Sequence, residues 1–253
     1  MGTLITGLCS VTLRRHPAAE VVALAAAARL ETIEWAGDLH APPGDRATAA
    51  DLRARTADAG LSVAAYGSYL RAGSTDPAEI SATVGTATAL GAPRIRIWAG
   101  TEASADATGS RRAAVAADTR RMCDEAADAG ITVAFECHAR TLTDDPASTL
   151  SLLADVARPN VGTYWQPPNG MPDAAALDTL DALLPHVAAV HAFSWWPGTH
   201  RRRLHERRHL WQAAAARLRT DVRSRDVLLE FVPDDEPTLV VPEAATLRRL
   251  LRP

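Results

Sequence analysis

Two glutamates and a histidine stand out as residues that could do chemistry, because each lies inside an apolar run. Glu136 occurs in VAFEC, Glu230 in LLEFV and His191 in AAVHAF. A carboxylate in such a run is costly to bury unless a partner neutralises it. Two carboxylates and one imidazole suit a divalent cation such as Mn²⁺, Mg²⁺, Co²⁺ or Zn²⁺. The alternative is that each is a separate core residue, held by an arginine or by the backbone.

The elements that must position these residues follow one repeating order: a short apolar run, a polar loop and an Ala-rich helical stretch. The apolar runs predict eight strands, over 4–10, 32–35, 62–67, 94–98, 132–137, 161–165, 187–193 and 227–232. Helices are predicted over 17–29, 48–59, 76–91 and 118–129. Strands that alternate with helices predict a parallel sheet, and eight such units are the size of a closed barrel.

We therefore expect residues 1–253 to form a single (β/α)₈ TIM-barrel domain. The competing fold is an open doubly wound sheet. That fold typically carries a glycine-rich nucleotide loop after its first strand. The segment GLCSVTLRR, which contains the end of the first predicted strand and the residues after it, has no such loop.

The composition excludes several classes of function. All 27 basic residues are arginine, so mechanisms that need a lysine amine or a P-loop lysine are excluded. The net charge of -3 argues against a nucleic-acid partner. The first apolar run is too short to span a bilayer and has no basic segment before it, so we expect no membrane association. Three widely spaced cysteines fit a cytoplasmic protein.

Barrel enzymes carry their chemistry at the C-terminal ends of the strands. The polar and aromatic residues predicted there are candidates for substrate binding: Glu34, His40, Arg96, Trp98, His138, Asn169 and Trp195. Tryptophans 35, 98, 165 and 195 all fall at strand ends, where their rings could stack on a sugar or simply fill the rim of the barrel. The alternatives are an ion-pair layer for Arg96 and, for His138, a role in orienting Glu136. The arginine-rich stretch 200–211 is either a phosphate site or a solvated surface.

The chain resembles the xylose isomerase-like sugar isomerase/epimerase family of TIM barrels along its whole length. The resemblance rests on IEWAGDLH, AAYGSYLR, RIRIWAG and FECHARTLTDD, together with the positions of His191 and Glu230. It implies a metal held by Glu, Asp, His and Glu from strands five to eight, with the two glutamates as the acid/base pair. The Asp position falls at Gln166, and a histidine of the family pattern becomes Asn169. The resemblance thus implies a metal site formed by Glu136, Gln166, His191 and Glu230, with a formal ligand charge of about −2.

These observations predict a divalent-metal-dependent isomerase or epimerase that acts on a sugar or sugar derivative. Glu136 and Glu230 would serve as base and acid, while the metal polarises the carbonyl and stabilises the enediolate. One alternative is a lyase or hydrolase that acts on a keto-glycoside. A second is a non-catalytic sugar-binding barrel that has lost its metal. Assembly into a homo-oligomer stays open.

Overall fold

A computed structural model describes residues 2–252, and Met1 and Pro253, the ends of the expected domain, lie outside the described residues. Eight parallel strands close into a barrel in the order β1-β10-β7-β6-β5-β4-β3-β2. Their bounds are Leu4–Cys9 (β1), Thr32–Ala36 (β2), Ser62–Arg71 (β3), Arg94–Trp98 (β4), Thr132–Phe135 (β5), Val161–Trp165 (β6), Val187–Ala192 (β7) and Arg225–Leu229 (β10). The predicted (β/α)₈ barrel is confirmed.

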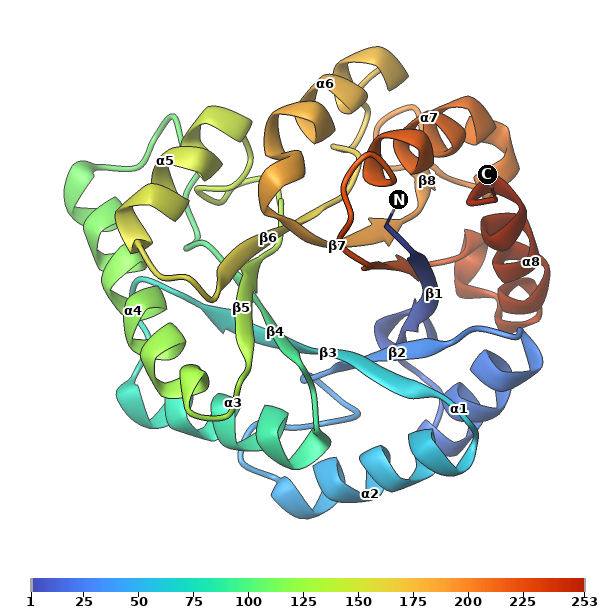
Figure 1. Ribbon diagram of the computed structural model, residues 1–253, viewed down its shortest axis with the longest axis horizontal. Helices are drawn as coiled ribbons and strands as arrows, with labels where there is room; N and C mark the ends of the chain where they lie inside the picture. Colours follow the sequence, from blue (N-terminus) through green and yellow to red (C-terminus); the bar gives the residue numbers. More distant parts are fainter. Residues whose placement is uncertain (1, 253) are drawn as a thin grey trace.

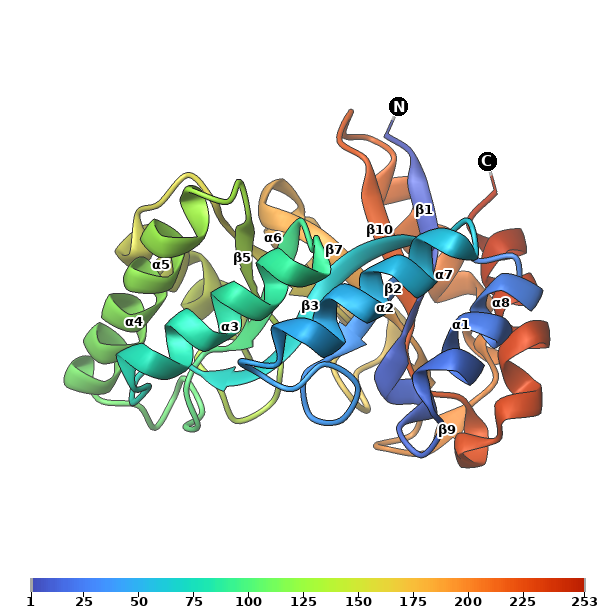
Figure 2. The ribbon, with the colours of Figure 1, turned by 90° about the horizontal axis from the view of Figure 1, so that it is seen from below.

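A ring of helices surrounds the strands (Figure 1). The helices are Ala18–Ala27 (α1), Arg46–Asp58 (α2), Pro77–Leu90 (α3), Gly109–Ala127 (α4), Pro146–Val156 (α5), Asp173–Leu183 (α6), Arg208–Leu218 (α7) and Val240–Leu250 (α8). A short antiparallel pair, β8 (Ser194–Trp195) and β9 (Arg201–Arg202), interrupts the loop after β7. In Figure 2, β9 lies on the side of the barrel opposite the N-terminus. Between residues 2 and 252, none of the helices has the length and apolar character needed to cross a membrane.

Some boundaries differ from those predicted. Strand β5 ends at Phe135 and β10 at Leu229, so both site glutamates directly follow their strands. The amides of Glu136 and Glu230 still donate to the neighbouring strands, at 2.9 and 3.1 Å, which fixes both residues at the rim. The next residue, Phe231, has a left-handed φ of 60° and turns the chain away. Helix α4 begins at Gly109, well before the predicted residue 118, because the segment between them is rich in alanine and arginine, which favour a helix.

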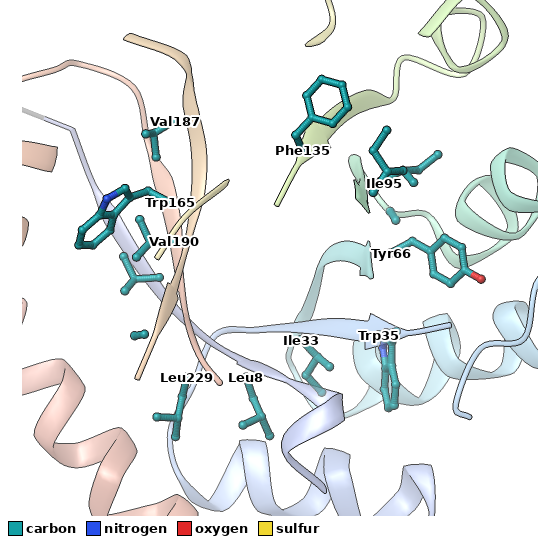
Figure 3. Close-up of a cluster of buried hydrophobic side chains, with 14 of the residues drawn as sticks. Leu8, Ile33, Trp35, Tyr66, Ile95, Phe135, Trp165, Val187, Val190 and Leu229 are labelled. Atoms are coloured by element: carbon teal, nitrogen blue, oxygen red, sulfur yellow. The ribbon is translucent and has the colours of Figure 1, made fainter. Parts of the chain in front are cut away.

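Side-chain alternation along the strands produces two separate cores. Outward-facing residues pack against the helices, and Figure 3 shows this core with Leu8, Ile33, Ile95, Phe135, Val190 and Leu229 among its members. Burial of each such side chain contributes roughly 1.5–3 kcal/mol. The inner core, which fills the lumen, includes Cys9, Ala65, Ala134, Tyr164 and Leu228. Its residues are mostly small, so the lumen has room above them for the polar groups of the rim.

Candidate active site

The predicted metal-binding residues come together in part. Nδ1 of His191 lies 3.0 Å from Oε1 of Gln166 and 3.4 Å from Oε2 of Glu230. Within the described part of the chain, the one group whose ligand atoms all lie within 4.8 Å of one another is Cys9, His191 and Glu230. Glu136 lies outside that group, but it lines the same cavity as Gln166 and Glu230. This cavity has a volume of about 560 Å³.

Glu136 is held away from the others by two donors. Arg96 donates to its Oε2 through Nη1, and Trp98 donates to the same oxygen through Nε1 at 2.5 Å. The indole of Trp98 is itself fixed by Arg71, whose guanidinium lies 3.7 Å from the ring centroid. Since both bonds end on Oε2, the Oε1 atom has no hydrogen-bond partner among residues 2–252 and is free to act on a ligand.

The two catalytic candidates have opposite electrostatic environments. Burial alone raises the pKa of Glu136, but the charge of Arg96 overrides it and the pKa falls below its ordinary value. Burial raises the pKa of Glu230 to about 7, because His191 only partly offsets the burial and the negative charge of Glu136 adds to it. Carboxyl groups whose environments push their pKa values apart are typical of acid/base pairs.

Glu34 lies beneath the cavity and does not line it. Its carboxylate accepts a hydrogen bond from the Tyr164 hydroxyl at 2.8 Å, and it lies 3.3 Å from both Nε of Arg96 and Nε2 of His191. Burial alone would raise the pKa of Glu34, but the charges of His191 and Arg96 lower it to about 2. Glu34 therefore orients the imidazole and the guanidinium, in the way that outer-sphere carboxylates orient metal-binding histidines.

The other expected substrate-binding residues fall into two sets. Those that line the cavity are Arg96, Trp98, His138, Asn169 and Trp195. His40 lies elsewhere, with Nδ1 3.1 Å from the hydroxyl of Ser10 and Nε2 2.9 Å from the carbonyl of His16, and it does not line the cavity. Trp35 points away from the rim and donates to Thr56 of α2 at 3.1 Å, so a stacking role for this ring is wrong.

Two residues of the site were missed from the sequence, Cys9 and Tyr164. Both face the lumen. The sequence signal for Tyr164 was available, since it alternates with Gln166 along β6 and therefore shares its face. The wide spacing of Cys9 from the other two cysteines gives no signal of a metal site, although Cys9 is the last residue of β1 and lies at the same rim.

The arginine-rich stretch 200–211 does not offer a set of unpaired cations for phosphate. Four of its arginines each pair with a carboxylate. These pairs are Arg201–Asp235, Arg202–Glu206, Arg203–Glu243 and Arg207–Asp173. The stretch instead ties the loop after β7 to α6, α8 and the loop after β10.

The rim residues fit a divalent cation. Neighbouring ligand atoms of an octahedral ion with bonds of about 2.1 Å lie about 3.0 Å apart. The distance of 3.0 Å from Nδ1 of His191 to Oε1 of Gln166 matches this edge, and the distance of 3.4 Å to Oε2 of Glu230 is slightly longer than it. The charges also fit, because the carboxylates of Glu34, Glu136 and Glu230 with the guanidinium of Arg96 sum to −2 (−3 + 1), which a dication beside a neutral imidazole would balance.

Several solved structures share this architecture. The probable 3-DHS dehydratase involved in petrobactin synthesis from Bacillus anthracis matches with a TM-score of 0.77 and 20% identity, covering 98% of this chain and 99% of that one. D-allulose 3-epimerase from Methylomonas sp. matches with a TM-score of 0.73 and 18% identity, over 100% and 99% of the two chains. A xylose isomerase-like TIM barrel protein from Mycobacterium smegmatis, in complex with magnesium, matches with a TM-score of 0.70 and 14% identity, over 99% and 97%. At such identities the likeness shows the fold.

No curated protein matches the chain in sequence. The match to a family of sequences says more about relationship than the likeness in fold, because it depends on the amino-acid sequence itself. Residues 22–220 match the family described as xylose isomerase-like TIM barrel. That range begins within α1, ends just after α7 and includes four of the site residues described above: Glu34, Glu136, Gln166 and His191. The chain belongs to the xylose isomerase-like TIM barrel family.

Proposed function

We propose that the protein is a divalent-metal-dependent isomerase or epimerase that moves a proton next to the carbonyl group of a sugar or sugar derivative. The observation that carries the proposal is the placement of Glu136 and Glu230 on one cavity. They follow β5 and β10, which are three places apart in the ring of eight strands. Two carboxyl groups so placed can reach different sides of a bound substrate, which proton transfer between faces or carbons requires.

Glu136, Gln166, His191 and Glu230 are the residues that would hold the cation. When bound, a divalent cation polarises a carbonyl oxygen and stabilises the negative charge that develops there. The carboxylate of Glu136, fixed by Arg96 and Trp98, takes a proton from the carbon next to the carbonyl. Glu230 returns a proton from the other side. These roles need no movement of the backbone, because both residues are bonded to neighbouring strands.

The cavity lining suits a sugar. Trp98 and Trp195 both contribute aromatic rings to the lining, with one face of Trp98 covered by Arg71, and His138 and Asn169 present groups that can hydrogen-bond hydroxyls. Trp195 is packed against Phe193 and Phe231, with ring centroids 5.1 and 5.5 Å away. An aromatic surface fixed in this way is available for stacking without further loss of side-chain freedom.

Deuterium exchange tests the proposal. The protein is loaded in turn with Mn²⁺, Mg²⁺, Co²⁺ and Zn²⁺ and incubated with a panel of ketoses and aldoses in D₂O. Deuterium at the carbon next to the carbonyl, in a product of unchanged carbon skeleton, supports the isomerase or epimerase. Absence of exchange with every sugar and metal, in protein shown to contain metal, contradicts it.

A second candidate is a lyase that expels a substituent after the same proton abstraction. A specific observation favours it: a further cavity of about 470 Å³ shares Val11, Arg14 and Phe231 with the first. A leaving group attached to the substrate would fit there. The product mass separates the two candidates, because an isomerase conserves the mass of the substrate and a lyase does not.

A further inference from the structure

Cys9 lies at the same level of the barrel as Glu230. It is the last residue of β1, which pairs with β10. In that pairing Leu8 is opposite Leu229, so the residues that follow each of them, Cys9 and Glu230, meet at the rim. The thiol faces the lumen and is 1% exposed. Its Sγ lies within 4.8 Å of a ring nitrogen of His191 and a carboxylate oxygen of Glu230.

Of the two partners of Cys9 in this group, Glu230 has unused hydrogen-bonding capacity. Glu230 is 6% exposed, yet its carboxylate accepts no hydrogen bond from residues 2–252, and its ion-pair contact is His191 at 3.4 Å. In His191 the nitrogen that faces Glu230 is Nδ1, at 3.4 Å, while Nε2 faces the carboxylate of Glu34 at 3.3 Å. Buried polar groups without partners are costly, and a bound cation is a common reason for them. The thiol of Cys9 donates to Oε1 of Glu34 at 4.0 Å, and its Sγ atom lies within 4.8 Å of the ligand atoms of His191 and Glu230.

We propose that the thiolate of Cys9 is a ligand of the cation held by His191 and Glu230, and that the site therefore selects Zn²⁺ or Co²⁺ over Mg²⁺. The inference rests on the metal site of the proposed function and specifies its metal. Thiolate favours the softer metals, whereas Mg²⁺ prefers oxygen ligands. On binding, the S–H proton leaves to solvent as the metal–sulfur bond forms.

The geometry requires only small movements. Tetrahedral zinc with bonds of about 2.0–2.3 Å holds its ligand atoms roughly 3.3–3.6 Å apart. Closing the present spacing, at most 4.8 Å, to that value is within reach of side-chain rotation. The thiolate of Cys9 would change the charge of the site from −2 to −3, so the attraction for a dication increases and the loaded site keeps a net charge of −1.

The test is a titration of metal-free protein with Co²⁺, because a cobalt–thiolate bond absorbs in the near ultraviolet. Wild type is compared with Cys9→Ser and with Cys123→Ser, a matched variant at a second buried cysteine on α4. We expect the band in wild type and Cys123→Ser and its loss in Cys9→Ser. Affinity of Cys9→Ser for Co²⁺ and Zn²⁺ should fall by at least about tenfold, which is the lower end of the effect of losing an outer-sphere partner. Its affinity for Mg²⁺ should change little.

A double variant, Cys123→Ser with Cys137→Ser, keeps Cys9 as the sole thiol and answers the question even if Cys9→Ser does not fold. The band must persist in it. Cobalt that binds to wild type without the band, with equal affinity in Cys9→Ser, overturns the role of Cys9 and leaves the proposed function standing. Failure of wild type to bind any of the metals overturns both.

Discussion

Glu230 is the carboxyl group of the site whose ionised form is least favoured by its surroundings. It is buried beside a second carboxylate, and its pKa is raised to about 7, chiefly by burial. Such a group is costly for stability, and its retention is explained by a chemical task or by a cation. Arg96 gives Glu136 a different environment, since it fixes one carboxylate oxygen and leaves the other free. The different roles proposed for the two glutamates thus follow from their different contacts.

Replacing Glu230 with glutamine should reduce turnover by at least about a hundredfold, since a positioned acid/base group contributes roughly 10²–10⁴-fold. The amide keeps the shape but can neither take nor give the proton. Rates are measured at saturating metal, and circular dichroism checks the fold. Glu20→Gln is the control, because Glu20 is an exposed partner of His16 on α1 and should retain full activity. Activity of Glu230→Gln above about a hundredth of wild type would contradict the assigned role.

Replacing Gln166 with aspartate should raise the affinity for a divalent metal, because it adds a negative charge 3.0 Å from Nδ1 of His191. Isothermal titration with Mn²⁺ measures the change. Gln212→Asp is the control, since Gln212 is exposed on α7. Equal affinity in wild type and Gln166→Asp would remove Gln166 from the ligand set and leave it as a substrate contact.

At the scale of elements, β3 shows how a strand makes room for the site. A Cβ atom at Gly67 would lie 2.9 Å from Oε1 of Glu34 and 3.0 Å from Nη2 of Arg96. The glycine therefore gives space to the buried ion pair between β2 and β4, the neighbours of β3 on either side. A side chain at position 67 of β3 would therefore displace the polar groups of both neighbouring strands.

Gly67→Ala should lower the free energy of unfolding by about 1–3 kcal/mol, the usual cost of an added methyl group in a packed core. It should also lower activity, since Arg96 can no longer hold Glu136 in place. Urea denaturation gives the first quantity. The control is Gly109→Ala at the start of α4, where a Cβ would meet no atom within 4 Å. That change should leave stability unaltered or raise it by up to about 1 kcal/mol. Equal free energies of unfolding in the two variants would show that Glu34 and Arg96 can move to admit the methyl group without loss of stability.

At the scale of the whole molecule, the site exists only when the barrel is closed. Its residues extend from Cys9 to Glu230, and the pairing of β1 with β10 brings those two ends of the sequence together. A ligand that bridges the rim therefore stabilises the closure itself. Metal binding and global stability should be linked.

Removal of the metal should lower the melting temperature of the protein. A ligand present at a hundred times its Kd stabilises the folded state by about 2.7 kcal/mol. For a chain of this size that corresponds to a shift of roughly 5–10 °C. Differential scanning calorimetry with and without a chelator measures it. The double variant Glu136→Gln with Glu230→Gln should show no shift, and an equal shift in that variant would place the metal elsewhere.

The sequence by itself determined the barrel and the inward direction of its key residues. The alternation of apolar runs with Ala-rich helices predicts strands and helices because each repeat needs a partner to bury its apolar face. Period-two alternation then places Glu136, His191 and Glu230 on the face opposite Phe135, Val190 and Leu229. Both properties depend on residues that are close together in the sequence, so one amino-acid sequence is enough to predict them.

Only the tertiary structure decided which polar groups meet. The stagger between neighbouring strands set Gln166 against His191 and Arg96 against Glu136, and the stagger across β3 set Arg96 against Glu34. It also placed Glu34 beneath the cavity and brought Cys9 level with Glu230, neither of which follows from alternation. The physical reason is that strand pairing fixes height in the barrel to within one residue, and hydrogen bonds and metal ligation depend on that height.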